Sequence, residues 1–449
     1  MAPPSAISPP PIEGGVNTTG GLTKQSAAYV KVWQEKVRGG FAPFPVVLEK
    51  AKNHILVDVD GKEYIDLITQ FAVMNFGYSH PKIVQAVVDQ VKKLPLVNTG
   101  YINPLYAQFA ERLTAKFGFD SIATMLSGSE AVESAIKIAR KWAYVKKGIQ
   151  ADEAWILTTD RCYHGITLAT MSLSNVIADH FGKHLPHVGP LAPSTGKLIE
   201  YGELHVLRET FEQDGHKIAA FIIEPIQGLS GTRIPPQGYL RAVQDLCHAH
   251  NILFICDEVQ TGYGRTGTDL AYQAEPGVQP DLVTLGKAVT GGMYPMSVIM
   301  GKAHVMDVVA KYEVAGTFAA SPVACAAALA ALDVLEEEKI AERAQMLGEE
   351  MTRTIDELAP PYVTDHRGRG RGLFQTLVLD ESKPGVTARR VAALAALRGV
   401  LVGNGANRLR FSPPLTIPKE DLIKAVNVVV QAIKDVETLG DFPGSDFLN

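Results

Sequence analysis

The chain has 449 residues, of which 46% are hydrophobic and 20% are charged, as in a globular enzyme with more than one domain. Its formal net charge of −5 argues against a nucleic-acid-binding protein, so we expect no nucleic-acid partner. The four cysteines are scattered without a CxxC pair, which argues against a metal site or a disulfide framework and indicates a reducing compartment.

Residues 1–25 have the composition of a flexible tail. They include a run of three prolines and a glutamate, and no basic residue precedes Lys24, unlike a mitochondrial presequence or a secretory signal. The most apolar stretch, residues 318–335, is interrupted by Ser321 and Pro322 and leads into three glutamates. It predicts a buried helix, so we expect a cytoplasmic protein without a membrane-spanning segment.

Short apolar stretches on both sides of residues 60–62, an Asp-Gly-Lys turn signal, predict a small N-terminal sheet. Residues 83–94 and 106–117 then have apolar side chains at helical spacing. Further along, buried strands alternate with helices, for example at residues 219–223 and 240–250, which predicts a largely parallel sheet.

Residues 126–130, Leu-Ser-Gly-Ser-Glu, open a long predicted helix with a serine and an acid at its start. Backbone N–H groups at such a helix end bind a phosphate where a glycine allows close approach, which makes Gly128 and Ser129 candidates. From the sequence alone, an ordinary capped helix explains the same pattern.

Two further strands end in side chains that suit a ligand site. The strand at residues 155–158 is followed by Tyr163, an aromatic that could stack on a ring, and by His164, which we expect to have a structural role. The strand at residues 219–223 ends at Glu224.

The stretch from residue 254 to residue 287 carries the strongest chemical signal. A buried strand ends at Asp257, and a second strand delivers Lys287 to the same edge of the sheet. A desolvated lysine can form a Schiff base, and a nearby aspartate can hold a protonated pyridine nitrogen. This is the division of labour that pyridoxal 5′-phosphate requires. A surface lysine and a strand-ending acid are the plainer alternative.

The stretches SGSEAVESAIKIARKW, DEVQTGYGRTG and GKAVTGGMYP follow one another along the chain. In sequence and in order they resemble motifs of the class III, ornithine aminotransferase-like, pyridoxal phosphate enzymes, and the resemblance extends over residues 44–414. The resemblance implies a fold-type I α/β transferase with pyridoxal 5′-phosphate as cofactor. It also implies a homodimer with shared active sites, in which Thr317 reaches the partner's cofactor phosphate.

The same resemblance implies a role for each matching residue. Lys287 is the Schiff-base lysine, and Asp257 is the partner of the pyridine nitrogen. The remaining cofactor contacts in one chain are Gly128, Ser129, Tyr163, Glu224, Val259 and Gln260. Arg410, in the stretch LRFSPP, is the arginine that binds the substrate carboxylate, a task that suits its planar fork of donors.

The chain departs from the ornithine enzymes at four substrate positions. Ile166 stands in place of the arginine that binds the ornithine carboxylate in those enzymes. Phe41 and Phe71 replace two tyrosines, and Leu229 replaces the glutamate that masks the arginine matching Arg410. Buried charges without partners are costly, so we predict an aminotransferase with an apolar donor pocket and a keto-acid acceptor. A racemase or epimerase of the same family and an ornithine or ω-amino-acid aminotransferase are the alternatives. A non-catalytic binding protein is the third class considered.

We predict four parts of the chain. Residues 1–25 form the tail, and residues 26–85 join a small α+β domain. Residues 86–335 form the large domain with a mostly parallel sheet flanked by helices, and residues 336–449 complete the small domain.

Overall fold

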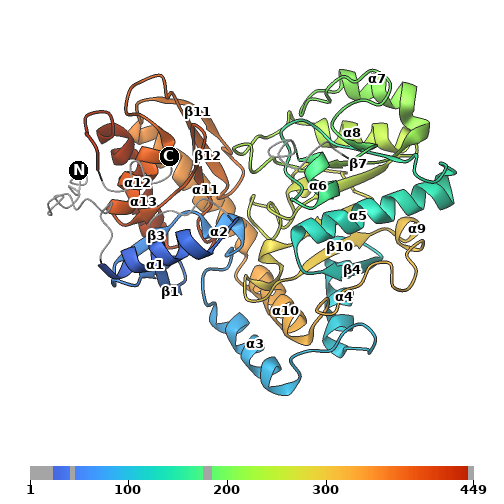
Figure 1. The fold of residues 1–449 in the computed structure, drawn as a ribbon, viewed down its shortest axis with the longest axis horizontal. Coiled ribbons are helices and arrows are strands. Elements are labelled where there is room, and N and C mark those ends of the chain that lie inside the picture. Colours follow the sequence, from blue (N-terminus) through green and yellow to red (C-terminus); the bar gives the residue numbers. More distant parts are fainter. Residues whose placement is uncertain (1–23, 41–45, 175–184, 443–449) are drawn as a thin grey trace. The chain divides into compact units, whose positions relative to one another are not determined.

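The computed structural model describes residues 24–40, 46–174 and 185–442, which Figure 1 shows as a ribbon. They form two compact units. The large unit comprises residues 70–345, and the small unit combines the chain up to residue 69 with the chain from residue 346 onward. Most of the expected tail, and also Phe41, lie outside the described residues. Among the described residues, no helix is long and apolar enough to cross a bilayer.

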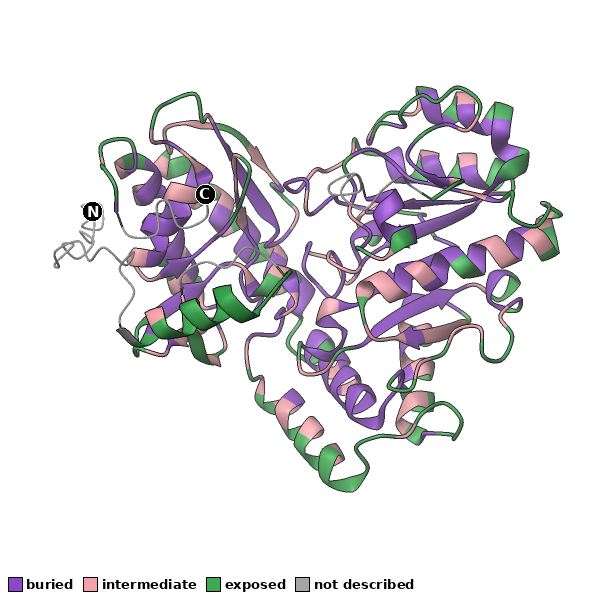
Figure 2. Cartoon of the chain, viewed as in Figure 1, coloured by how far each residue is buried: buried purple, intermediate pink, exposed green. Residues whose placement is uncertain are grey.

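The large unit is built on a seven-stranded sheet with the order β4–β10–β9–β8–β7–β5–β6. Its strands are β4 (Ser121–Met125), β5 (Trp155–Leu157), β6 (Val188–Gly189), β7 (Ile218–Ile223), β8 (Leu253–Asp257), β9 (Leu282–Leu285) and β10 (Ser297–Gly301). The strands from β9 to β6 pair in parallel, and β10 pairs antiparallel with both of its neighbours, β4 and β9. Figure 2 shows the sheet interior as buried, and β7, β8 and β9 are buried throughout. Largely apolar strands of this kind are typical of a parallel sheet covered on both faces.

The helices of the large unit are α3 (Pro81–Lys93), α4 (Pro104–Phe117), α5 (Gly128–Trp142), α6 (Leu168–Leu173), α7 (His205–Asp214), α8 (Tyr239–Ala249), α9 (Ala303–Met306) and α10 (Pro322–Glu337). Helices α5 and α8 pack against the sheet, whereas α3 packs against α10. Shorter turns are η1 (Ala143–Lys147), η3 (Gly215–Lys217), η4 (Ala271–Ala274) and η5 (Lys287–Thr290). Helix α5 begins with a capping box: Glu130 N–H donates to Ser127 Oγ at 3.2 Å, and Ser127 N–H donates to Glu130 Oε2 at 2.7 Å. These bonds satisfy donors at the helix start and fix its position at the end of β4.

The small unit contains two four-stranded sheets, β1–β2–β3–β13 and β11–β12–β15–β14. The strands are β1 (Leu48–Lys52), β2 (Ile55–Asp58), β3 (Glu63–Asp66), β11 (Val363–Arg367), β12 (Gln375–Leu379), β13 (Val400–Leu401), β14 (Gly403–Gly405) and β15 (Arg408–Phe411). Its helices are α1 (Lys24–Lys36), α12 (Ala388–Leu397) and α13 (Lys419–Asp435), and α11 (Ile340–Leu358) enters it from the large unit. The parallel pairing of β3 with β13 joins the N- and C-terminal segments, as expected for the small α+β part.

Candidate active site

Three neighbouring strands of the large sheet deliver the predicted chemical groups to one edge. β7 leads into Glu224, β8 ends at Asp257, and β9 leads through Gly286 into Lys287, the first residue of η5. Because these strands are parallel neighbours, their carboxyl ends meet at the same edge of the sheet. Thr284 pairs with Asp257 in the register of β8 and β9. The edge is therefore a concentrated set of polar side chains on an otherwise apolar sheet.

Asp257 is only 5% exposed and has three hydrogen-bond donors. Its Oδ1 accepts from Val259 N–H at 3.0 Å and from Thr284 Oγ1 at 3.1 Å, and its Oδ2 lies 2.7 Å from Nδ1 of His164. Donors at both oxygens hold the side chain in one orientation, and its burial keeps solvent away from it.

His164 is the buried cationic partner of this carboxylate. Burial lowers the pKa of His164, but Cys162 and Asp257 raise it further, so the pKa lies well above its usual value. Its Nε2 lies 3.1 Å from Oγ1 of Thr158. The sequence predicts only a structural role for His164, although it directly follows the predicted site residue Tyr163. Its position next to Tyr163 is the sequence signal that points to the site. The contact with Asp257 leaves no local pattern, because the two residues are 93 positions apart.

Glu224 ties two loops of the site together. Its Oε1 accepts from Tyr163 N–H at 2.8 Å, and its Oε2 accepts from Gly228 N–H at 3.1 Å. Burial raises the pKa of Glu224 to about 7; Asp257 also raises it and His164 opposes the shift. The carboxyl group therefore fixes the backbone of the candidate stacking residue Tyr163 without reaching solvent.

Glycines allow several segments of the site to pack closely at the start of α5. A methyl group added at Gly128 would lie 2.7 Å from Cγ1 of Val259, and one added at Gly286 would lie 3.3 Å from the same atom. A methyl group at Gly165, where φ is +124°, would collide with Oγ of Ser129. The α5 N-terminus, Val259 and the residue before Lys287 are therefore in close contact.

Lys287 and Gln260 complete the part of the site within the large unit. Lys287 is half-buried and has a positive φ of 42° at the start of η5. The amide Nε2 of Gln260 donates to the carbonyl oxygen of Phe71 at 3.1 Å. This bond connects the strand end that carries Asp257 with one of the predicted substrate residues.

The other predicted substrate and partner residues have different surroundings. Ile166 is 59% exposed, Leu229 is half-buried, and Thr317 is exposed on the segment between β10 and α10. Phe41 is not among the described residues. Arg410 belongs to the small unit, where it lies half-buried on β15.

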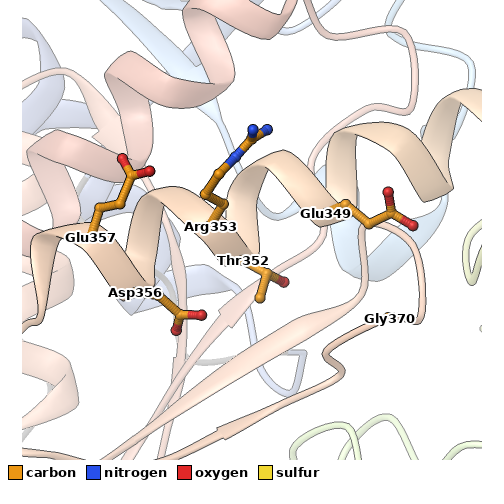
Figure 3. A pocket seen from close by; sticks show the side chains of 6 residues that line it. All are labelled: Glu349, Thr352, Arg353, Asp356, Glu357 and Gly370. Atoms are coloured by element: carbon orange, nitrogen blue, oxygen red, sulfur yellow. The ribbon is translucent and has the colours of Figure 1, made fainter.

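The small unit has a hollow on its own surface. Figure 3 shows its lining, which consists of Glu349, Thr352, Arg353, Asp356, Glu357 and Gly370. Asp356 is already paired with Arg369, at 2.8 and 2.5 Å. None of the predicted site residues lines this hollow.

The residues at the sheet edge fit a phosphorylated pyridine aldehyde. The desolvated carboxylate of Asp257 suits a protonated ring nitrogen, and the glycine-lined start of α5 suits a phosphate. The half-buried amine of Lys287 suits an aldehyde. Fold and site together define a pyridoxal-phosphate-dependent transferase of fold type I. The chain belongs to the class-III aminotransferase family, whose model matches residues 38–433.

Known relatives agree with this family. The chain is 40% identical over 403 residues to an ornithine aminotransferase of Emericella nidulans, covering 89% of this chain and 88% of the relative. It is 39% identical over 407 residues to an ornithine aminotransferase of Schizosaccharomyces pombe, covering 90% and 92%. The predicted family, fold class and cofactor are confirmed by these matches together with solved structures.

Two solved structures have the same fold. An acetylornithine aminotransferase from Elizabethkingia anophelis is 35% identical, with a TM-score of 0.81 and coverage of 92% of this chain and 100% of that chain. An ornithine aminotransferase from Toxoplasma gondii is 33% identical, with a TM-score of 0.86 and coverage of 93% and 97%. The protein is therefore a pyridoxal-phosphate-dependent transaminase, which leaves its substrates to be assigned.

Proposed function

We propose that the amino donor is an amino acid or amine with an apolar side chain, and that the acceptor is a keto acid such as 2-oxoglutarate or pyruvate. The observation that carries this proposal is the absence of polar groups at four positions that match substrate residues of the ornithine enzymes, namely Phe41, Phe71, Ile166 and Leu229. Ile166, which replaces an arginine, has no donor for a carboxylate.

The energetic argument rests on unpaired charge. A donor such as ornithine carries a charged carboxylate and ammonium group at the end remote from the reacting amine. An apolar pocket cannot replace the water that these groups lose, and each missing charge-assisted hydrogen bond costs roughly 1.5–3 kcal/mol. Two such losses amount to a preference of about a hundredfold or more against ornithine.

Arg410 is the residue that we assign to carboxylate binding. Burial, and then the positive charge of Arg408, lower the pKa of Arg410 to about 10, so the guanidinium remains charged at neutral pH. A partly desolvated cation is favourably paired with an incoming anion. With Leu229 in place of a masking glutamate, we infer that Arg410 binds the carboxylates of both donor and acceptor.

We assign the chemistry to groups at the sheet edge. Pyridoxal phosphate, when bound, supplies an aldehyde for the amino group and a ring that accepts electrons. Nζ of Lys287 would remove the proton from the donor carbon as a general base and, as a general acid, would deliver it to the carbon that carries the cofactor's aldehyde group. Asp257 would hold the proton on the ring nitrogen, and His164 orients the Asp257 carboxyl group. Tyr163 stacks on the ring, and Glu224 fixes its backbone.

Val259 packs under the ring, and Gln260 contacts its phenolic oxygen. The amide nitrogen of Gln260 has two N–H groups, of which one donates to Phe71 and the second can serve that oxygen. Gly128 and Ser129 are the proposed phosphate contacts, since both lie in the first turn of α5.

We further propose a homodimer with shared active sites. Thr317 is exposed, and large apolar side chains are exposed on the same unit at Tyr101, Ile102, Tyr312 and Phe318. Exposed apolar groups of this size favour a partner surface. Sedimentation should give a dimer, whereas an active monomer that binds the cofactor would exclude sharing.

We propose that the protein acts in the cytoplasm, since its four cysteines are free and buried. Several relatives are named as mitochondrial enzymes, so a mitochondrial location is the alternative to be tested. Cell fractionation should place the protein in the cytosolic fraction, and recovery in organelles would contradict the assignment.

An ornithine aminotransferase remains the second candidate, because relatives that are 40% and 39% identical to this chain have that name. A racemase or epimerase would use the same cofactor residues but return the proton to the substrate carbon. A panel of donors separates these possibilities: apolar amino acids, ω-amines and ornithine are each mixed with the loaded enzyme, without acceptor. We expect conversion of the cofactor to its amine form with apolar donors. Fast, selective conversion by ornithine would favour the second candidate, and loss of chirality without conversion would favour the racemase.

A further inference from the structure

Phe71 lies within a left-handed turn. The backbone of α2 (Thr69–Ala72) has φ values of +49°, +52°, +62° and +68°, all in the left-handed region. None of these residues is glycine, and Thr69 is β-branched, for which this conformation is a marked outlier. Strain of this kind persists only where surrounding contacts impose it, and it is concentrated at functional sites.

The first contacts that impose the turn come from Asp66. This carboxylate is buried and accepts from Ile68 N–H at 2.7 Å and from Thr69 N–H at 3.1 Å. Both donors belong to the residues that lead into the turn. Asp66 therefore fixes the entry of the chain into the left-handed conformation.

A second set of contacts joins this segment to the end of β15. Ser412 N–H donates to the carbonyl of Leu67 at 2.8 Å, and Ser412 Oγ donates to the carbonyl of Ile68 at 2.9 Å. In return, Oγ1 of Thr69 donates to the carbonyl of Ser412 at 2.6 Å. Thr69 is fully buried, so this hydroxyl bond does not compete with solvent. We call these three bonds the Thr69–Ser412 latch.

Ser412 of the latch lies two residues after Arg410, directly past the end of β15. On one side of β15, Arg410 pairs with Thr376 of β12; on the other, it pairs with Gly403 of β14. A methyl group at Gly403 would lie 3.3 Å from Cβ and 3.8 Å from Nε of Arg410. The arginine side chain therefore lies over a glycine, and the strand that carries it is fixed at its end by the latch.

We propose that Thr69 is a positioning residue for carboxylate binding by Arg410. This inference rests on the proposed function, which assigns the substrate carboxylate to Arg410. The left-handed backbone directs the Thr69 hydroxyl to the Ser412 carbonyl, and this bond fixes the strand end from which the guanidinium projects. The benefit is a preoriented arginine, because geometry within a fraction of an ångström decides whether a carboxylate is bound at two points.

The test removes the hydroxyl while keeping the shape of the side chain. In Thr69→Val we expect the KM for the keto acid and the inhibition constant of glutarate, an unreactive dicarboxylate, to rise about fivefold to tenfold, with kcat nearly unchanged. Thr69→Ser retains the hydroxyl and should restore both constants. Ser412→Ala, which removes another bond of the latch, should give a smaller change in the same direction.

Two controls separate positioning from general stability. Thr210→Val removes a buried hydroxyl bond of 2.7 Å to a backbone carbonyl in α7 and should leave both constants unchanged. In an Arg410→Leu background, Thr69→Val should have no further effect, because the group that it positions is absent.

The outcomes are distinct. If Arg410→Leu does not raise the KM for the keto acid, the proposed role of Arg410 fails. If Arg410→Leu raises it but Thr69→Val does not, or if the Thr69→Val effect persists in the Arg410→Leu background, the positioning role fails while the proposed function stands.

Discussion

The ion pair between His164 and Asp257 leads to a prediction about stability that does not depend on substrate. In His164→Gln, an amide of similar reach replaces the imidazolium, so a neutral donor faces Asp257. The original contact is a 2.7 Å bond between two buried groups. Hydrogen bonds to charged groups contribute about 1.5–3 kcal/mol, so we expect the free energy of unfolding to fall by about 2–3 kcal/mol near pH 6.

The loss should depend on pH with a defined sign. Folding raises the pKa of His164, so the protonated form is favoured in the folded state. The stabilisation is fully present below the unfolded pKa, about 6.5, and declines by about 1.4 kcal/mol per pH unit until the pH passes the folded pKa. The difference between the natural protein and His164→Gln should therefore shrink from pH 6 toward pH 9.

The assay is urea unfolding of the cofactor-free protein at several pH values. Removing the cofactor matters because a bound ring nitrogen would share Asp257. Cys162 and Glu224 also face this pair, so both proteins are compared at every pH. A difference that stays constant from pH 6 to pH 9, or grows with pH, would refute the charged state that we assign to His164.

Three other predictions follow from the site. Borohydride reduction and peptide mapping should find the cofactor attached to Lys287, and attachment to another lysine would refute its assignment. Since folding raises the Glu224 pKa to about 7, the natural protein should lose roughly 3 kcal/mol between pH 4.5 and pH 7 through this group; Glu224→Gln should lack that loss, and equal pH profiles in urea unfolding would contradict it. Gly128→Ala, which crowds Val259, should lower stability by about 1–3 kcal/mol in thermal unfolding, whereas Gly405→Ala, with nothing within 4 Å, should not; equal effects would show that the contact is absent.

The part of the site that could be predicted depends on local signals. The apolar strand before Asp257, the strand before Lys287 and the Ser-x-x-Glu pattern at residues 127–130 each lie within a few residues of the group that they place. Parallel strand order then brings these groups to one edge. Local sequence was sufficient here because β8 and β9 are short apolar runs and the start of α5 carries its own capping pattern.

The part that could not be predicted depends on contacts between distant residues. Thr69–Ala72 contains no glycine or asparagine, so its composition gives no sign of a left-handed turn. The turn is imposed in part by Ser412, 343 residues further along the chain. The contact of His164 with Asp257 is likewise a consequence of tertiary packing, which overrides local preference.

The central claim is the preference for an apolar donor over ornithine. It is tested most directly by the kcat/KM for ornithine, relative to that for the best apolar donor, in the natural protein and in Ile166→Arg. We predict a low ratio in the natural protein and at least a tenfold increase in the variant, because an arginine restores a charge-assisted bond to the donor carboxylate. A natural protein that prefers ornithine, with no gain in Ile166→Arg, would contradict the claim.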